Sequence, residues 1–381
     1  MIDDLEKHFD VAIIGGGLAG LALSIQLANS GYKIALFEKE EYPFHKVCGE
    51  YISMESWDFI ESLGLSLKML GVAKIDNLIV SAPNGNVLNA SLPLGGFGIS
   101  RFTLDNELKQ IALAANVTVY EKCKVEDIVF TDDIFQLQTT IGNFSSRLCC
   151  GSYGKRSNLD IKWKRNFILL KSNKLSNFIG VKYHIKTKFS PDTIALHNFK
   201  NGYCGISKIE GDKYCLCYLT TAKNLKENSN SISTMEKNVL YQNIHLKSIF
   251  ENCEHLYLAP ITISQISFNS KTKVENHILF IGDAAGSITP LCGNGMSMAL
   301  HGSKIAAALV TAFLSKKIDR NELEKNYQQQ WQKTFGNRLF IGRAIQRMFG
   351  REATTNLFVF IMKKIPGITR WLIKQTHGVP F

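Results

Sequence analysis

A short glycine-rich segment near the N-terminus limits the folds open to this chain more than any other feature. Gly15-Gly16-Gly17-Leu18-Ala19-Gly20 follows the apolar run 9–14 and precedes a largely apolar segment, 18–29, that ends before Gly31. A second apolar run, 33–38, comes next. This order predicts a strand, a helix and a second strand, and such a unit makes the two strands parallel. The N-terminal part is therefore expected to be a Rossmann-type α/β fold.

The spacing of the glycines predicts what this turn binds. Gly15, Gly17 and Gly20 fit the pattern G-x-G-x-x-G, in which the glycines allow a tight turn, close approach to a pyrophosphate, and close helix–strand packing. A pyrophosphate then lies over the free N–H groups at the start of the helix. Glu38 ends the second strand, where a carboxylate accepts hydrogen bonds from an adenosine ribose.

A second segment has the chemistry needed by a polyol chain and an anionic ring. Gly282 and Asp283 follow the apolar run 278–281, and Pro290, Gly293, Asn294, Gly295 and Met296 then lead into a long helix expected over 294–314. An aspartate at the end of a strand can bind a hydroxyl group, and the N–H groups at a helix start stabilise negative charge.

Two further segments, 44–50 and 100–108, contain polar residues that could face a cofactor. Arg101 precedes a helix expected over 103–115 that Thr103 could cap. Either a structural salt bridge or contact with an anionic cofactor accounts for Arg101, and the residues alone leave both open.

Taken together, these motifs resemble one superfamily. The glycine fingerprint, Lys46-Val47-Cys48-Gly49-Glu50, Ser-Arg-x-x-Leu-Asp from Ser100, and the run from Gly282 to Gly295 occur in the order and spacing of the p-hydroxybenzoate-hydroxylase-like flavoproteins. That superfamily includes aromatic monooxygenases, geranylgeranyl reductases and flavin-dependent halogenases. The resemblance covers roughly residues 9 to 315, and the form of the 46–50 segment is closest to the reductase branch.

The resemblance implies bound FAD, with NADPH or NADH as electron donor. It implies Glu38 on the adenosine ribose, Val125 beside the adenine, Arg101 near the cofactor, Asp283 on the ribityl chain, and residues 293–295 along the isoalloxazine edge. The implied cofactor-binding residues are Gly15, Gly17, Leu18, Ala19, Gly20, Glu38, Lys39, Lys46, Arg101, Val125, Gly282, Asp283, Pro290, Gly293, Asn294, Gly295 and Met296. Cys48 is the candidate catalytic residue, by proton delivery or redox contact, with a packed small side chain as the alternative.

The sequence departs from the superfamily at two places. The hydroxylases have Gly-Ala-Asp-Gly-x-x-Ser in the middle of the chain, whereas here Tyr153 replaces the acid, which argues against the hydroxylase manner of using NADPH. The halogenase motif Trp-x-Trp-x-Ile-Pro has no counterpart at 202–207, which argues against halogenation.

The remaining pattern predicts the domain organisation. The FAD-binding domain is discontinuous, formed by 1–75, 99–160 and 270–315, and a mixed-sheet substrate domain is formed by 76–98 and 161–269. A C-terminal helical segment, 316–381, is broken at Gly350 and at Pro366-Gly367. The fold class is thus α/β with an α+β insertion.

Charge and cysteine content predict the environment. Nine cysteines without C-x-x-C spacing indicate buried, reduced thiols, no metal site and a cytoplasmic location. The net charge is +11, and residues 338–374 hold eight Lys or Arg against one acid, Glu352. Arg343, Arg347 and Arg351 repeat every four residues, a pattern that fits a helix capping the substrate domain better than peripheral membrane contact. Nucleic-acid binding is not expected, because no basic patch interleaves with stacking aromatics.

The expected function is an FAD-dependent oxidoreductase acting on a small apolar molecule. Hydroxylation of an aromatic, polyketide-like or lipid-like compound comes first, and reduction of an alkene in a lipid-like compound is the alternative. A non-catalytic flavin-binding protein is a second alternative. The sequence does not identify the substrate or the oligomeric state.

Overall fold

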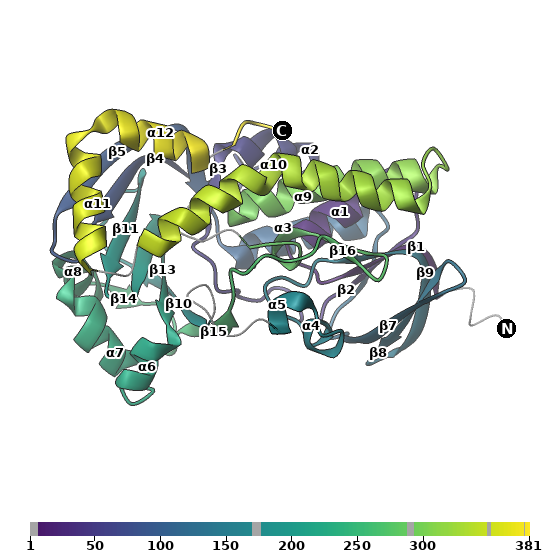
Figure 1. The fold of residues 1–381 in the computed structure, drawn as a ribbon, viewed down its shortest axis with the longest axis horizontal. Coiled ribbons are helices and arrows are strands. Elements are labelled where there is room, and N and C mark those ends of the chain that lie inside the picture. The colour runs from purple at the N-terminus through teal and green to yellow at the C-terminus, as the bar shows by residue number, and fades with distance from the viewer. Residues whose placement is uncertain (1–6, 170–176, 288–292, 349–351, 377) are drawn as a thin grey trace.

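The computed structural model describes residues 7–169, 177–287, 293–348, 352–376 and 378–381. Two β-sheets lie toward opposite ends of the long axis of the molecule, and helix α10 (Arg320–Met348) runs along the top between them (Figure 1). Helices α11 (Glu352–Lys364) and α12 (Pro366–Thr376) follow α10; the predicted break at Pro366-Gly367 is confirmed, and Gly350 lies outside the described residues.

The first sheet is the predicted Rossmann-type sheet. Its main order is β16-β17-β9-β1-β2-β6, and β8 joins it by pairing with both β7 and β9. The strands are β1 (His8–Ile14), β2 (Ile34–Phe37), β6 (Thr118–Tyr120), β7 (Val125–Thr131), β8 (Ile134–Thr139), β9 (Gly142–Gly151), β16 (Val274–Glu275) and β17 (Ile278–Phe280). The central strands β2, β1, β9 and β17 are parallel, as apolar strands buried on both faces favour.

Helices α1 (Leu18–Asn29), α3 (Arg101–Ala114) and α9 (Gly295–Leu314) share one large apolar core with this sheet. Trp331 and Phe335 of α10 belong to the same core, so the C-terminal segment packs on the Rossmann-type domain as well as on the second sheet. Helix α9 is long and apolar enough by composition to cross a bilayer. Its residues Leu300, Ala306 and Val310 are nevertheless fully buried, as in the core helix of a globular domain.

The second sheet is mostly antiparallel, in the order β14-β10-β13-β12-β11-β4-β5-β3, with β15 paired to β10. Its strands are β3 (Tyr51–Ser53), β4 (Ala73–Ser81), β5 (Val87–Gly98), β10 (Phe178–Lys186), β11 (Thr193–Phe199), β12 (Gly202–Lys208), β13 (Tyr214–Thr221), β14 (Glu254–His255) and β15 (Ile261–Ile266). Strand β3 and the first residues of β4 lie in this sheet although the sequence places 1–75 with the first domain. The boundary at residue 75 is therefore not a boundary between the two sheets.

Short helices complete the second domain. They are α6 (Ala222–Glu227), α7 (Ile232–Val239) and α8 (Ile244–Glu251). Asn243 begins α8, because its side-chain carbonyl caps the helix by accepting from His245 N while its amide donates to the carbonyls of Ala82 and Asn198. Two other short helices, α4 (Asn158–Lys162) and α5 (Asn166–Leu169), follow β9, and α2 (Trp57–Ser62) follows β3.

Candidate active site

The glycine turn between β1 and α1 has the backbone geometry that the sequence predicts. Gly15 has a φ of +102°, and a Cβ at this position would lie 2.6 Å from the Cα of Tyr153. A Cβ on Gly20 would overlap the carbonyl oxygen of Gly15, so helix and strand approach as closely as the third glycine of the pattern permits. Gly17 is the N-cap and brings no capping side chain, which leaves the first turn of α1 open to an anion.

Glu38 lies directly beside this turn. Its carboxylate is 6% exposed and accepts hydrogen bonds from the N–H groups of Gly16, at 3.0 Å, and Glu40, at 3.2 Å. Tyr42 covers the same glycine by donating to the carbonyl of Gly16. The N–H of Cys123 donates to the carbonyl of Glu38, which brings the start of β7 to this end of the sheet.

Two cations face the glycine turn. A Cβ built on Gly17 would have a guanidinium nitrogen of Arg101 at 3.6 Å and the ammonium group of Lys46 at 3.7 Å. Arg101 donates two bonds of 2.7 Å to Asp105, and Lys46 lies 3.2 Å from the same carboxylate. Burial raises the pKa of Asp105, but Arg101 and Lys46 outweigh it and hold this pKa below its ordinary value. The structural salt bridge of Arg101 is therefore present, and contact of Arg101 with an anionic cofactor at the turn stays a prediction.

The Gly282-Asp283 turn reaches the same place from the other half of the domain. Gly282 has a φ of +61°, and a Cβ there would lie 3.2 Å from that of Ala19 and 3.4 Å from that of Ala299. Because Ala19 is in the first turn of α1, Asp283 is presented beside the helix start. This close packing between α1 and α9 explains why glycine and alanine occur at these positions.

Two buried cations hold the carbonyl groups of this turn. Lys271 is 3% exposed and donates to the carbonyl oxygen of Asp283, at 2.8 Å, and to that of Lys155, at 3.0 Å. Arg165 is fully buried and donates to the carbonyl oxygen of Ala284 at 3.2 Å. Burial lowers the pKa of Lys271 to about 8.

Tyr153, which replaces the acid of the hydroxylase motif, is connected to a different acid. Its hydroxyl donates to Asp160 at 2.7 Å, and Arg165 donates to the same carboxylate oxygen at 2.9 Å. Burial, followed by the charge of Asp160, raises the pKa of Tyr153 well above its ordinary value. The carboxylate at this end of β9 thus comes from the start of a helix seven residues later, and it is tied to Arg165.

Helix α9 begins beside Tyr51 of the second sheet. Gly293 has a φ of +67°, and a Cβ there would lie 3.1 Å from the Tyr51 ring. Asn294 is the buried N-cap, and the first turn, which includes Met296, contains no acidic residue. Pro290 lies outside the described residues.

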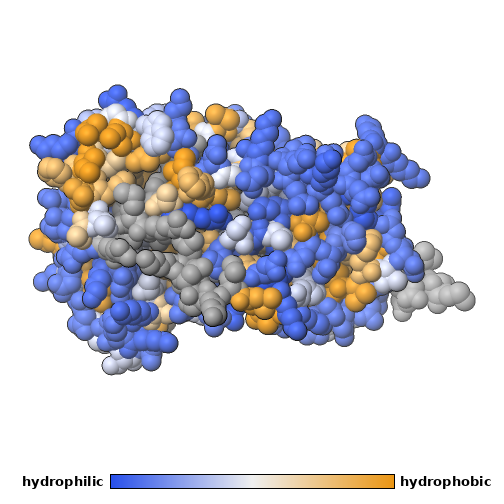
Figure 2. Space-filling view, viewed as in Figure 1, coloured by the Kyte–Doolittle hydropathy of each residue, from blue (hydrophilic) through white to orange (hydrophobic). Residues whose placement is uncertain are grey.

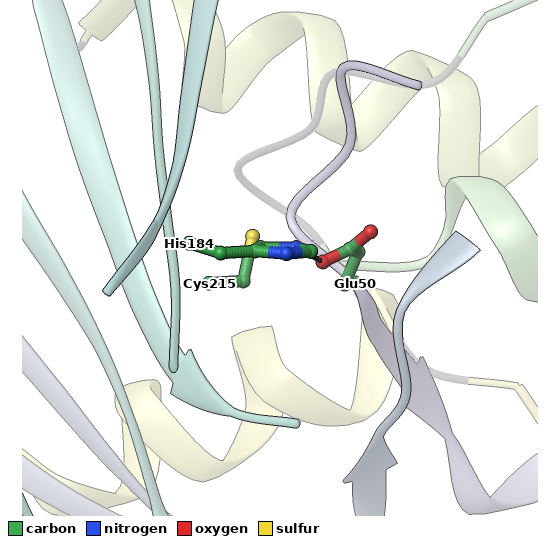
Figure 3. A group of neighbouring side chains, drawn as sticks. All are labelled: Glu50, His184 and Cys215. Carbon is green, nitrogen blue, oxygen red and sulfur yellow. Dashed lines mark hydrogen bonds and ion pairs between the residues drawn. The ribbon is translucent and has the colours of Figure 1, made fainter. Parts of the chain in front are cut away.

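Segment 44–50 joins the two domains through Glu50 (Figure 3). Glu50 is fully buried and accepts from Nε2 of His184 at 2.6 Å, from the ammonium group of Lys182, and from the N–H of Arg101 at 2.8 Å. Burial raises the pKa of Glu50, but Lys182 and the bond from His184 outweigh it and lower this pKa to about 2. Glu50 therefore stays ionised at neutral pH.

Cys48 lies beside this cluster. Cys215, opposite His184 in the β10–β13 pair, donates its S–H to the carbonyl of Cys48 at 3.3 Å. Cys48 is half-buried and lies two residues before Glu50, whose carboxylate accepts from the Arg101 N–H and from Lys182. The cluster continues outward from His184, which lies 3.4 Å from the Tyr257 hydroxyl. The ring of half-buried His45 contacts both His184 and Tyr257.

Among the described residues, Glu50, His184 and Cys215 are the one group whose ligand atoms lie within 4.8 Å of one another, as a metal site would require. The Lys182 ammonium already neutralises the Glu50 carboxylate, and burial raises the pKa of Cys215 well above its ordinary value. We therefore interpret the group as a buried ion-pair network. The sequence analysis did not identify it, and its members become neighbours only through the strand register.

The structure describes two further residues predicted to bind the cofactor, Lys39 and Val125. The Lys39 side chain is 68% exposed and pairs with Glu40. Val125 is buried in the core at the start of β7, near Glu38, so its predicted place beside an adenine stays a prediction.

Several known proteins are similar to this chain over most of its length. A family model described as pyridine nucleotide-disulphide oxidoreductase matches residues 9–158. Conditioned medium factor receptor 1 of Dictyostelium discoideum is 25% identical over 94% of this chain and 72% of that protein. Digeranylgeranylglycerophospholipid reductase of Methanococcus vannielii is 23% identical over 86% of this chain and 83% of that protein. The structure of a flavin-dependent brominase has a TM-score of 0.79, with 18% identity over 97% of this chain and 93% of that chain, and it shows the shared fold.

The turn and its surroundings fit a flavin dinucleotide. The open face of Gly17 with two cations beside it suits a pyrophosphate, the carboxylate of Glu38 suits a ribose, and the uncapped start of α9 suits an anionic ring edge. Fold and site therefore define a Rossmann-type flavoprotein. The resemblance to FAD-dependent oxidoreductases that the motifs predict is confirmed, and FAD is the cofactor.

Proposed function

We propose that this FAD-dependent oxidoreductase reduces a carbon–carbon double bond in an apolar, lipid-like molecule. The observation that carries the proposal is the position of Cys48 on the segment that joins the glycine turn to the second sheet, two residues before Glu50, which accepts from the Arg101 N–H and from Lys182. The similarity to a digeranylgeranylglycerophospholipid reductase over most of both chains supports the same reaction class.

The residues that would hold FAD come from both halves of the first domain. Residues 15–20 with Lys46 and Arg101 would bind the pyrophosphate, Glu38 the adenosine ribose, Asp283 the ribityl chain, and residues 293–296 the ring edge. Bound FAD supplies the two-electron chemistry, with NADPH or NADH as the proposed electron source. Reduction of a double bond adds a hydride to one carbon and a proton to the other. The protein must supply that proton and exclude water from the site.

Cys48 is the proposed proton donor. Its main-chain carbonyl accepts from the Cys215 thiol, which holds this segment against the second sheet beside the Glu50 network. His184, Tyr257 and His45 form a line of hydrogen bonding and ring contact toward the surface, because Tyr257 is 41% exposed. This line is the proposed route by which the proton is replaced.

Hydroxylation and flavin binding without catalysis remain as the competing outcomes. The acid of the hydroxylase motif is absent, because Tyr153 stands in its place. The nearby carboxylate of Asp160 accepts hydrogen bonds from Tyr153 and Arg165.

We also propose a cytoplasmic location, which the buried free thiols of Cys149, Cys150 and Cys204 fit.

The test is an anaerobic turnover experiment on the purified, FAD-loaded chain with a polyprenyl lipid that contains double bonds. Dithionite first reduces the protein, and mass spectrometry then measures saturated product and deuterium uptake from D₂O. We expect saturated product with the wild type, and at least a tenfold loss with Cys48→Ser but not with the control Cys253→Ser, whose thiol lies away from the site near α8.

Three results would contradict the proposal. Oxygenated product formed only with O₂ would assign hydroxylation. A flavin that no donor or substrate changes would assign a binding protein. Saturated product at an unchanged rate in Cys48→Ser would remove Cys48 from the mechanism. A scan of the flavin absorption with NADPH and then NADH identifies the donor.

A further inference from the structure

Helices α11 and α12 are apolar on two opposite sides. On the inner side, Val359 and Met362 of α11 pack against Val80 and Leu88 of the second sheet. Ile373 of α12 packs in a separate cluster with Tyr51 and other residues of that sheet. This inner side accounts for the fold of both helices, and it leaves their outer apolar residues without a structural role.

The outer side exposes large apolar side chains. We call this surface the α11–α12 face, and its members, with the exposed fraction of each, are Leu357 (59%), Phe360 (51%), Ile361 (39%), Ile365 (48%), Ile368 (39%) and Trp371 (56%). Figure 2 shows apolar residues gathered at the upper left, over α11 and α12 of Figure 1. Soluble monomers rarely leave large apolar patches of this kind uncovered.

Basic residues surround these apolar residues. Lys363 and Lys364 lie in the last turn of α11, Lys374 lies in the last turn of α12, and Arg370 is exposed between them. The only acidic residue in 352–376 is Glu352, at the start of α11. Lys364 lies over the Phe360 ring at 5.9 Å, so charge and apolar surface belong to one face.

We propose that the α11–α12 face docks this protein on an anionic lipid membrane. A helix surface with apolar and aromatic residues rimmed by Lys and Arg lies in the plane of a bilayer interface. The apolar side chains then enter the acyl boundary, while long basic side chains reach the headgroups. Each Lys or Arg near an anionic leaflet adds to the attraction.

The charge of the face argues against a second copy of the chain as its occupant. A symmetric dimer would place the same surface on both partners and bring two sets of basic residues together, which is unfavourable. An anionic bilayer matches both the apolar and the basic component. The α11–α12 face does not include the basic residues Arg343, Arg347 and Arg351. Arg343 is half-buried, and the side chains of the other two lie outside those the structure describes.

The inner side of α12 is connected to the candidate active site through two side chains. Ile373, on the inner side of α12, packs with Tyr51, whose ring contacts the position of Gly293 at the start of α9. A docked protein would thus hold the second sheet and this end of the site close to the lipid. The docking proposal does not depend on which reaction the site performs.

The test is co-sedimentation of the full chain with vesicles of phosphatidylcholine alone or with phosphatidylglycerol added. We expect binding to the anionic vesicles that weakens at high salt and is roughly tenfold or more weaker in Lys363→Glu/Lys364→Glu and in Phe360→Ser/Trp371→Ser. Matched controls are Lys226→Glu/Lys237→Glu, on exposed positions of α6 and α7, and Val129→Ser, a 53% exposed apolar residue of β7.

Circular dichroism and thermal melting of every variant establish that it is folded. No binding by the wild type, or equal loss in the face variants and the controls, would overturn the proposal. A concentration-dependent dimer in analytical ultracentrifugation that Phe360→Ser/Trp371→Ser abolishes would assign the face to a second copy and would also overturn it.

Discussion

The ammonium group of Lys271 donates a 2.8 Å hydrogen bond to the main-chain carbonyl of Asp283 from a side chain that is almost completely buried. Arg165 holds the next carbonyl in the same way. The turn that contains Asp283 lies beside α1, and hydrogen bonds from two buried cations hold its main-chain carbonyl groups. The main-chain position of this half-buried aspartate therefore depends on buried charge elsewhere in the domain.

The pH dependence of stability should reveal Lys271. Its pKa is lowered by burial to about 8 in the folded protein, from about 10.5 when exposed, so between these values the unfolded chain binds more protons. Stability then rises with pH, and the free energy of unfolding of the wild type relative to Lys271→Met should increase by up to about 3 kcal/mol between pH 8 and 10.5. Urea unfolding across this range is the measurement, and Lys226→Met, at an exposed position, should show no such increase. If the difference in the free energy of unfolding between wild type and Lys271→Met does not change with pH, burial does not lower the pKa of Lys271.

Replacement of Lys46 should weaken FAD binding. Its ammonium group lies near Gly17 and is partly held by Asp105, and a charge-assisted bond to a pyrophosphate contributes about 1.5–3 kcal/mol. We expect Lys46→Met to bind FAD roughly tenfold to a hundredfold more weakly, measured by titration of the apoprotein with FAD. Lys39→Met is the matched control, because the side chain of Lys39 is exposed and should not change the affinity. Equal affinities in the two variants would contradict the proposed role of Lys46.

The Glu50 network should stabilise the contact between the two domains. Glu50→Gln leaves Lys182 buried without its counter-charge, so we expect a loss of roughly 3–5 kcal/mol in the free energy of unfolding at pH 7. Because the folded pKa is about 2, below the ordinary 4.5, this contribution is present above pH 4.5 and is lost as the pH falls toward 2. The difference between wild type and variant in urea unfolding should therefore shrink on acidification. A difference that is constant from pH 7 to 3 would exclude an ionised Glu50 as its cause.

Alanine at Gly20 should disrupt the turn itself. Its Cβ would overlap the carbonyl oxygen of Gly15, and because that oxygen belongs to the main chain and cannot rotate away, the helix must move away from the strand. We expect a loss of about 1–3 kcal/mol or more in stability together with a loss of bound FAD. Gly367→Ala is the control, since no atom lies within 4 Å of the added carbon. Thermal melting and the flavin content of the purified protein measure both effects.

Several elements could be predicted from the sequence because their signals are local. The glycine turn, α1 over Leu18–Asn29 and β2 follow from apolar periodicity and from backbone angles that favour glycine, and the structure confirms them. The break between α11 and α12 follows from Pro366, since proline is tolerated in the first turn of a helix but not in its interior. Motif order and spacing likewise sufficed for the superfamily and for FAD.

The tertiary structure decided which distant residues became neighbours. His184 and Cys215 lie opposite each other because of the register between β10 and β13, and Glu50 meets them because segment 44–50 crosses to the second sheet. Arg165 donates to Asp160 and also to the carbonyl of Ala284, far along the chain, because β9 and β17 are neighbours in the first sheet. Sequence patterns report local backbone preference and the side of an element that is buried, whereas burial of charge depends on partners that the chain brings together only when it is folded.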